Sequence, residues 1–140
     1  MKVSEAMTAQ VITITPQTTI EEAARKMSQV DTGVLPVVDG GKVVGLLTDR
    51  DIVVRAVAKG EGVAGPVSAI MSAEVFSCGA DDSVADATGK MASNQVRRLV
   101  VLGEGGQLVG ILSLGDVATD YGAKAVGQTL EVISEAPATH

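Results

Sequence analysis

The sequence predicts an α+β protein in which two copies of one β-α-β-β-α unit pack as a pseudo-twofold pair. The first observation is a repeated motif. A glycine, two apolar residues, a hydroxyl, two further positions and an aspartate run from Gly45 to Asp51 and again from Gly110 to Asp116. The second observation is that a shift of 64 positions, which becomes 65 after the first predicted hairpin turn, aligns most of the two halves. The third is the same order of strand-like and helix-like runs in both halves, and two copies indicate a closed pair rather than a solenoid.

Each copy begins with a short segment and an extended stretch, and the β-branched residues of the stretch in the first copy predict a strand or an edge connector. These are residues 3–8 with 11–15 in the first copy, and 67–72 with 75–78 in the second. A hydroxyl three residues before an acid then predicts a helix start in both copies, because such a pair forms a capping box. The pairs are Thr19 with Glu22 and Ser83 with Asp86.

Two apolar runs joined by a glycine-containing turn follow in each copy and predict a β-hairpin. The runs are 35–38 with 43–47, and 99–102 with 108–112. Thr48 and Ser113 then begin the closing helices. We expect a first repeat at 1–64, with a linker at 60–66, and a second repeat at 65–122. A helix-compatible extension and tail would follow at 123–140.

The composition argues against several classes of protein. A net charge of −6 disfavours a nucleic acid or an anionic membrane as partner, since both require a basic surface. A single cysteine, Cys78, forms no intramolecular disulfide and suits a reducing compartment. The chain shows no basic start followed by an apolar run, and no apolar run of about 20 residues that would span a bilayer. We therefore expect a cytoplasmic protein.

The sequence offers little for catalysis. The only histidine is His140, at the end of the chain, so no Ser-His or Cys-His dyad is expected in a rigid site. Zinc sites need clustered Cys and His, and this chain has one of each, far apart. The acids Asp49 and Asp51 lack the spacing of a calcium-binding EF-hand. We predict no catalytic residue, no metal ligand and no cofactor, and expect that the protein is not an enzyme.

The pairs Thr48 with Asp51 and Ser113 with Asp116 have two interpretations. A hydroxyl at the N-cap and an acid three residues later form a capping box, which favours a structural role. The alternative is that the carboxylate accepts hydrogen bonds from the two vicinal hydroxyls of a ribose, as an acid does in dinucleotide sites. Both interpretations can hold for one residue in different ligand states.

Arg97 and Arg98 are an adjacent basic pair before an apolar strand, whereas the first copy has Gly33 and Val34 at the matching positions. The pair is either a solvated strand end or a phosphate contact, since guanidinium groups bind phosphate bidentately. The difference predicts that the two copies form sites that are not equivalent.

These patterns resemble the CBS-domain pair, in its small stand-alone bacterial or archaeal form, over about residues 1–120. The resemblance is carried by 7–8, 23–27, 33–39 and 45–53 in the first copy, and by 71–72, 96–101 and 110–116 in the second. It implies a Bateman module, in which two repeats pack sheet to sheet and leave two clefts for adenosine-containing ligands. Such ligands are AMP, ADP, ATP and S-adenosylmethionine, with or without Mg²⁺.

The resemblance also assigns roles to residues. Thr48 with Asp51 and Ser113 with Asp116 would hold ribose, and Arg97 with Arg98 would reach phosphate, in the cleft of Asp51. Asp49 and Arg50, inside the first motif, complete the expected ligand-binding set. The implied protein is a homodimer that senses energy state and signals to a separate protein by a change of shape, with exposed Val53, Val54 and Val57 as dimer contacts. The alternative is a structural or protein-interaction dimer whose clefts hold no ligand.

Overall fold

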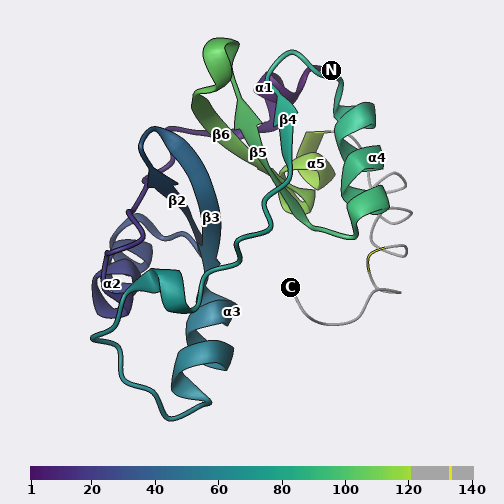
Figure 1. The fold of residues 1–140 in the computed structure, drawn as a ribbon. Coiled ribbons are helices and arrows are strands. Elements are labelled where there is room, and N and C mark those ends of the chain that lie inside the picture. Colours follow the sequence, from purple (N-terminus) through teal and green to yellow (C-terminus); the bar gives the residue numbers. More distant parts are fainter. Residues whose placement is uncertain (121–132, 134–140) are drawn as a thin grey trace. The chain divides into compact units, whose positions relative to one another are not determined.

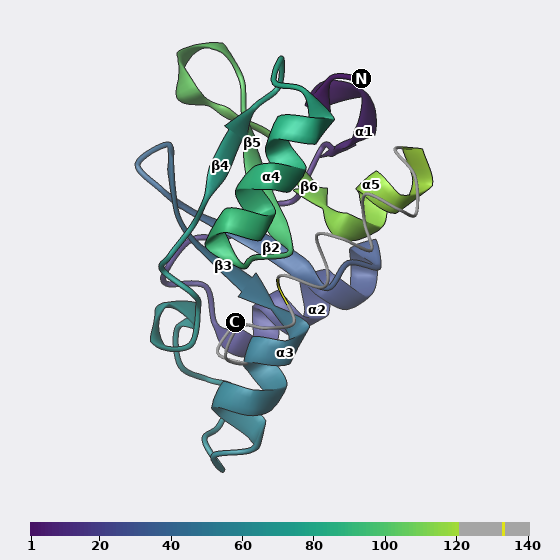
Figure 2. The same cartoon turned by 90° about the vertical axis from the view of Figure 1, so that its right-hand side faces the viewer.

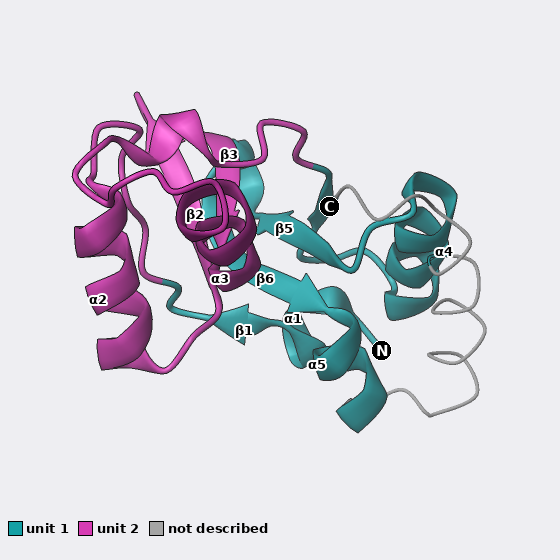
Figure 3. Cartoon of the chain, turned by 90° about the horizontal axis from the view of Figure 1, so that it is seen from below, with its two compact units in different colours: residues 1–11, 76–140 teal, residues 12–75 magenta. Residues whose placement is uncertain are grey.

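A computed structural model of the chain describes residues 1–120 and residue 133 (Figure 1). Apart from Ile133, the extension expected at 123–140 lies outside the described residues, as does His140. The chain divides into two compact units (Figure 3). Unit 1 consists of Met1–Val11 and the chain from Phe76 onward, and unit 2 is Ile12–Val75.

Unit 1 contains a four-stranded sheet in the order β1-β6-β5-β4, in which β4 runs parallel to β5 and the other pairs are antiparallel. Its strands are β1 Thr8–Ala9, β4 Ser77–Gly79, β5 Arg98–Leu102 and β6 Leu108–Ser113. Its helices are α1 Val3–Ala6, α4 Val84–Asn94, α5 Leu114–Asp120 and the 3₁₀ turn η3 Glu104–Gly106. The predicted second hairpin is therefore confirmed as β5 and β6.

Unit 2 repeats this plan with fewer strand residues. Its antiparallel hairpin is β2 Val34–Asp39 with β3 Lys42–Thr48, as predicted. Its helices are α2 Ile20–Val30, α3 Asp49–Asp51, the π-helix η1 Ile52–Val57 and the 3₁₀ turn η2 Val67–Ala69. Single bridges, Ile14 to Val37 and Leu46 to Ser72, stand where unit 1 has β4 and β1.

Unit 2 lacks a strand equivalent to β4 because a proline occupies a position that donates a hydrogen bond in unit 1. In unit 1 the amide of Val100 donates to the carbonyl of Phe76 at 3.0 Å. The position that matches Val100 is Pro36, which has no N–H to donate. The stretch before α2 keeps only the bonds from Ile14 to the Pro36 carbonyl and from Val38 to the Ile14 carbonyl. It is therefore the edge connector that the sequence left open as an alternative to a strand.

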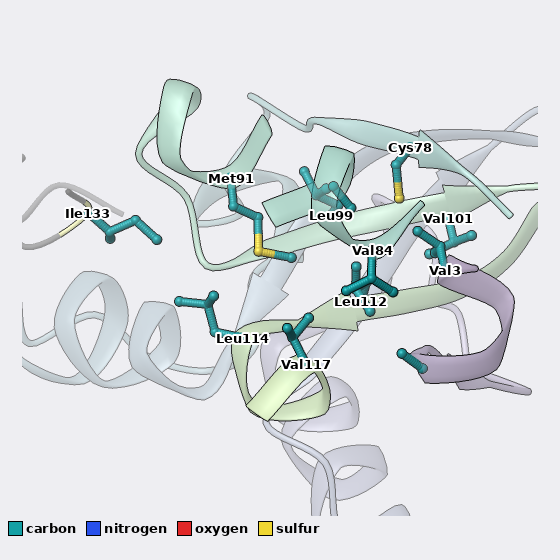
Figure 4. Packing of buried hydrophobic residues seen from close by; sticks show 12 residues of the cluster. Val3, Cys78, Val84, Met91, Leu99, Val101, Leu112, Leu114, Val117 and Ile133 are labelled. Carbon is teal, nitrogen blue, oxygen red and sulfur yellow. The ribbon is translucent and has the colours of Figure 1, made fainter. Parts of the chain in front are cut away.

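The helix caps and cores also follow the predicted pattern. Thr19 accepts a hydrogen bond from the Glu22 amide, and Ser83 from the Asp86 amide, at 3.1 and 3.0 Å. In unit 1, α4 runs across the strands (Figure 2) and buries Val84, Ala87 and Met91 against them. Figure 4 shows that aliphatic, Met and Cys side chains build this core, to which Ile133 also belongs.

The opening segment of each sequence repeat packs with the rest of the other repeat. The amide of Val84, which begins α4, donates to the Met1 carbonyl at 2.9 Å, and that of Ile20 donates to the Gly65 carbonyl at 3.0 Å. The packing therefore changes unit after Val11 and after Val75. The boundaries predicted at 64 and 65 follow the repeat of the sequence, which is a different division, and remain predictions.

The glycine that opens each motif is required by this exchange. A Cβ atom at Gly110 would lie 2.7 Å from both the Met7 sulfur and the Thr8 carbonyl oxygen. A Cβ atom at Gly45 would lie 2.7 Å from the Met71 sulfur. Real Cβ atoms do not approach other atoms so closely, so the exchanged segments can lie on β3 and β6 only where no side chain is present.

Candidate ligand-binding motifs

Each hydroxyl-acid pair forms a reciprocal cap where a strand passes into a helix. In unit 2, Asp51 Oδ2 accepts from the Thr48 amide at 2.9 Å, and Thr48 Oγ1 accepts from the Asp51 amide at 3.1 Å. In unit 1, Ser113 and Asp116 make the same two bonds, both at 3.1 Å. The capping interpretation is confirmed for both pairs. In both, carboxylate oxygen Oδ1 takes no part in the cap, so a further hydrogen-bond donor can use it.

Asp116 receives such a donor from the other end of the chain. The Thr8 hydroxyl lies 3.3 Å from each oxygen of the Asp116 carboxylate. Thr8 is exposed and Asp116 is half-buried, so solvent reaches this contact. The strand pairing of Thr8 with Ile111 holds the hydroxyl beside the motif.

Asp51 lies in a different environment. It is 7% exposed, and its Oδ1 lies 3.8 Å from Nε of Arg55, one turn further along the helix. Arg55 also donates through Nη1 to the carbonyls of Ile70 and Met71, at 3.1 and 3.4 Å. The arginine therefore ties Asp51 to the segment that follows the linker. Unit 1 has no arginine at this position, because the matching residue is Asp120.

Arg98 and Arg97 lie beside the motif of unit 1. Arg98 is directly opposite Ser113 in the antiparallel register, so both side chains project from the same face of the sheet. The Leu114 amide donates to the Arg97 carbonyl at 3.1 Å. Within residues 1–120, neither guanidinium has an ion pair or a hydrogen bond. Asp51 belongs to unit 2, and the expectation that these arginines serve its cleft remains a prediction.

Asp49 and Arg50 have contacts that the motif alone did not indicate. The Asp49 amide donates to the Gly33 carbonyl, and the Asp49 carboxylate accepts from the Arg50 amide, both at 2.9 Å. A Cβ atom at Gly33, the position that matches Arg97, would lie 3.0 Å from that carboxylate, so a side chain there would require Asp49 to shift slightly. Arg50 is exposed. The ligand-binding roles of both residues remain predictions.

Thr8 and Arg55 were not predicted as site residues. A signal for Thr8 was present, since a shift of 64 positions aligns it with Ser72 and places a hydroxyl at both positions. Arg55 could have been found as the basic residue four positions after Asp51, which is one helical turn. The Thr8 signal does not indicate which acid is contacted, because that contact joins residues 108 positions apart.

The described residues also bear on other kinds of site. In residues 1–120 and 133, no group of three or more His, Cys, Asp or Glu side chains is placed to hold a metal ion. In the same residues, no helix has both the length and the apolar character needed to cross a membrane. Burial raises the pKa of the Cys78 thiol to about 11; the charge of Asp82 adds to this effect and that of Lys90 opposes it. Such a thiol is a poor nucleophile at neutral pH.

Comparison with known proteins agrees with this geometry. The model of the CBS domain matches the chain twice, at residues 3–57 and 67–121. The CBS domain-containing protein YhcV of Bacillus subtilis is 43% identical over 133 residues, which cover 94% of each chain. The structure of the CBS domain protein TA0289 of Thermoplasma acidophilum is 25% identical with a TM-score of 0.82, over 94% of this chain and 75% of that one. The CBS domain pair of protein MJ0100, in complex with 5′-methylthioadenosine and S-adenosyl-L-methionine, is 27% identical with a TM-score of 0.75, over 85% and 94%. The chain belongs to the CBS domain family, and it carries the domain as a tandem pair.

Proposed function

We propose that the protein is a non-catalytic regulatory module that binds an adenosine-containing ligand and signals by a change of conformation. The observation that carries the proposal is the pair of capped aspartates, each with an oxygen that the cap does not use. The MJ0100 domain pair, which was solved with two adenosine compounds, supports this class of ligand. AMP, ADP, ATP and S-adenosylmethionine are the candidates.

The chemistry of the motifs suits a nucleoside. An ionised carboxylate only accepts hydrogen bonds, and its two oxygens match the two vicinal hydroxyls of a ribose. We assign that role to Asp51 with Thr48 and to Asp116 with Ser113. Phosphate oxygens would be bound by Arg98 and Arg97, whose guanidinium groups have no partner within residues 1–120. Mg²⁺ would arrive with ATP, held mainly by its phosphates.

Signalling requires a partner. A ligand can shift a conformational equilibrium only by its differential affinity for the two states. We propose a cytoplasmic homodimer that reports energy state to a separate protein. The dimer surface would include Val53, Val54 and Val57 of η1, which are 58%, 43% and 60% exposed.

The second candidate is a structural or protein-interaction dimer that binds no nucleotide. Two observations favour it: both caps are complete without a ligand, and η1 exposes three valines. Under this proposal the motifs only begin helices. Isothermal titration against AMP, ADP, ATP and S-adenosylmethionine, with and without Mg²⁺, separates the two candidates. No detectable binding of any of the four favours the second candidate.

The phosphate role is tested by replacing both Arg97 and Arg98 with alanine. We expect AMP to bind about tenfold or more weakly, since charge-assisted hydrogen bonds are lost, while adenosine is almost unaffected. Replacing Arg25 and Lys26 of α2 with alanine removes the same charge elsewhere and should leave both affinities unchanged. Equal losses for AMP and adenosine would contradict the assignment.

A further inference from the structure

The Asp116 motif differs from the Asp51 motif in one respect that bears directly on ligand binding. Both oxygens of Asp116 are within hydrogen-bond distance of the hydroxyl of Thr8, a residue of the exchanged N-terminal segment. In the described structure, the matching hydroxyl of Ser72 makes no hydrogen bond to Asp51. The Thr8 hydroxyl thus stands where a hydroxyl of a ribose would donate.

We infer that Thr8 holds the place of the ribose on Asp116 and that a ligand with a vicinal diol displaces its hydroxyl. This inference rests on the proposed function and specifies which motif takes the ribose. A hydroxyl has one proton, so Thr8 donates to one Asp116 oxygen at a time. A diol has two protons and can donate to both oxygens, so it replaces Thr8 with a net gain of one hydrogen bond.

Three observations favour Asp116 over Asp51 as the acceptor of the diol. Asp116 is half-buried and its neighbour Thr8 is exposed, so a ligand reaches the contact, whereas Asp51 is 7% exposed. The free oxygen of Asp51 already lies 3.8 Å from Nε of Arg55. Arg98 lies opposite Ser113, the hydroxyl partner of Asp116, whereas Val34 is the matching residue opposite Thr48. The sequence-based expectation had assigned the arginines to Asp51, and the inference assigns them to Asp116.

Displacement of Thr8 also provides a route by which ligand binding at the motif could change the conformation of the neighbouring chain. Thr8 belongs to β1, and the chain passes from unit 1 into unit 2 between Val11 and Ile12. Between them, Gln10 has φ 55°, a left-handed conformation that is uncommon for residues other than glycine. A ligand that releases the Thr8 side chain would therefore loosen residues 8–11, the segment that leads directly into unit 2.

The experiment measures the affinity of the full chain for adenosine and for 2′,3′-dideoxyadenosine, which lacks the diol. Thr8→Val removes the hydroxyl and keeps the shape, so we expect adenosine to bind about threefold to tenfold more tightly and dideoxyadenosine to be unchanged. Thr8→Ser restores the hydroxyl and should return the affinity to the wild-type value. Ser72→Ala is the matched control in unit 2 and should change neither affinity.

The outcomes separate the inference from the proposed function. If wild type binds adenosine but Thr8→Val leaves its affinity unchanged, weakens it, or tightens dideoxyadenosine equally, the inference is wrong and the proposed function stands. If neither wild type nor Thr8→Val binds any adenosine compound, both fail. Hydrogen exchange of the wild type provides a readout without mutation. Adenosine should alter exchange at residues 8–11 and not at 72–75, and the reverse result would also overturn the inference.

Discussion

Unit 1 and unit 2 are built from one repeated sequence, yet their motifs have different neighbours. In unit 1, Asp116 meets an exposed hydroxyl, and Arg98 lies opposite its cap. In unit 2, Asp51 is buried and paired with Arg55. The capping bonds are the same in both units, so the local motif does not determine what the carboxylate can bind. The neighbours that differ come from outside the motif.

The exchanged segments of the two units also differ in how closely their backbones pack against the strands. The Thr8 carbonyl oxygen would lie 2.7 Å from a Cβ atom at Gly110, and the Ser72 carbonyl oxygen would lie 3.0 Å from one at Gly45. Backbone atoms are displaced less easily than the end of a methionine side chain. The segment of unit 1 is therefore the less tolerant of added volume.

The largest expected effect follows from this difference. Gly110→Ala should lower the free energy of unfolding by about 1–3 kcal/mol, because the new methyl group overlaps both backbone and sulfur, and Gly45→Ala should cost less. Gly89→Ala in α4 is the control, since a Cβ atom there meets nothing within 4 Å. It should stabilise the protein by about 1 kcal/mol. Urea denaturation measures all three, and equal losses at Gly110 and Gly45 would contradict the comparison.

The next effect concerns the two carboxylates. Asp51→Ala should cost about 2 kcal/mol of stability, because it removes a cap and leaves Arg55 without that partner. Asp116→Ala should cost about 1 kcal/mol, since only a cap and an exposed hydroxyl contact are lost. Asp51→Asn keeps an acceptor for the Thr48 amide and should recover part of the loss. The two denaturation midpoints test this, and a larger loss for Asp116→Ala would show that the pairing with Arg55 contributes little.

The smallest expected effect is a pH dependence of stability that arises in unit 1 alone. Cys78 in unit 1 matches Ile14 in unit 2, and burial raises the thiol pKa from its ordinary 9.0 to about 11. The unfolded chain therefore loses this proton at lower pH than the folded chain does. The stabilisation is fully present below pH 9.0 and is lost as the pH rises through about 11. By pH 10 the loss should be about 1 kcal/mol.

Cys78→Val has no titrating group at this position and provides the control. Its stability should fall less steeply than that of the wild type as the pH rises from 9.0 towards 11, where the thiol of the unfolded chain is ionised and that of the folded chain is still protonated. Other groups that titrate in this range affect both proteins alike. Parallel curves would mean that the thiol is as easily ionised in the folded chain as in the unfolded one.

Much of the fold could be predicted because it depends on neighbouring residues. The glycines of the first hairpin turn, Gly40 and Gly41, have φ values of 59° and 80°, as a tight turn between two apolar runs requires. The caps at Thr19 and Ser83 form within three residues. The closing helix of the first copy was predicted as one helix, and the structure divides it into α3 and the π-helix η1. Its apolar pattern does not distinguish these helix types.

The site could be predicted only in part. The bonds between each hydroxyl and its aspartate span three residues and follow from the motif. The contact of Thr8 with Asp116 does not, because it depends on the exchange of the opening segments. The sequence repeat, which aligns each segment with its own copy, gave no sign of this exchange. Likewise, the pairing of Arg55 with the Ile70 carbonyl requires the segment after the linker to return to η1.

The two-copy α+β plan, the caps, the hairpins and the aspartates of the motifs follow from the sequence, because periodicity and short-range hydrogen bonds act between residues close in the chain. The segment that completes each unit and the donor that reaches each carboxylate are set by long-range packing. They depend on packing such as that of Met7 and Thr8 against Gly110, which is far from them in the sequence. Long-range packing of this kind depends on the shape of the folded chain, and the one-dimensional pattern of residues does not specify it.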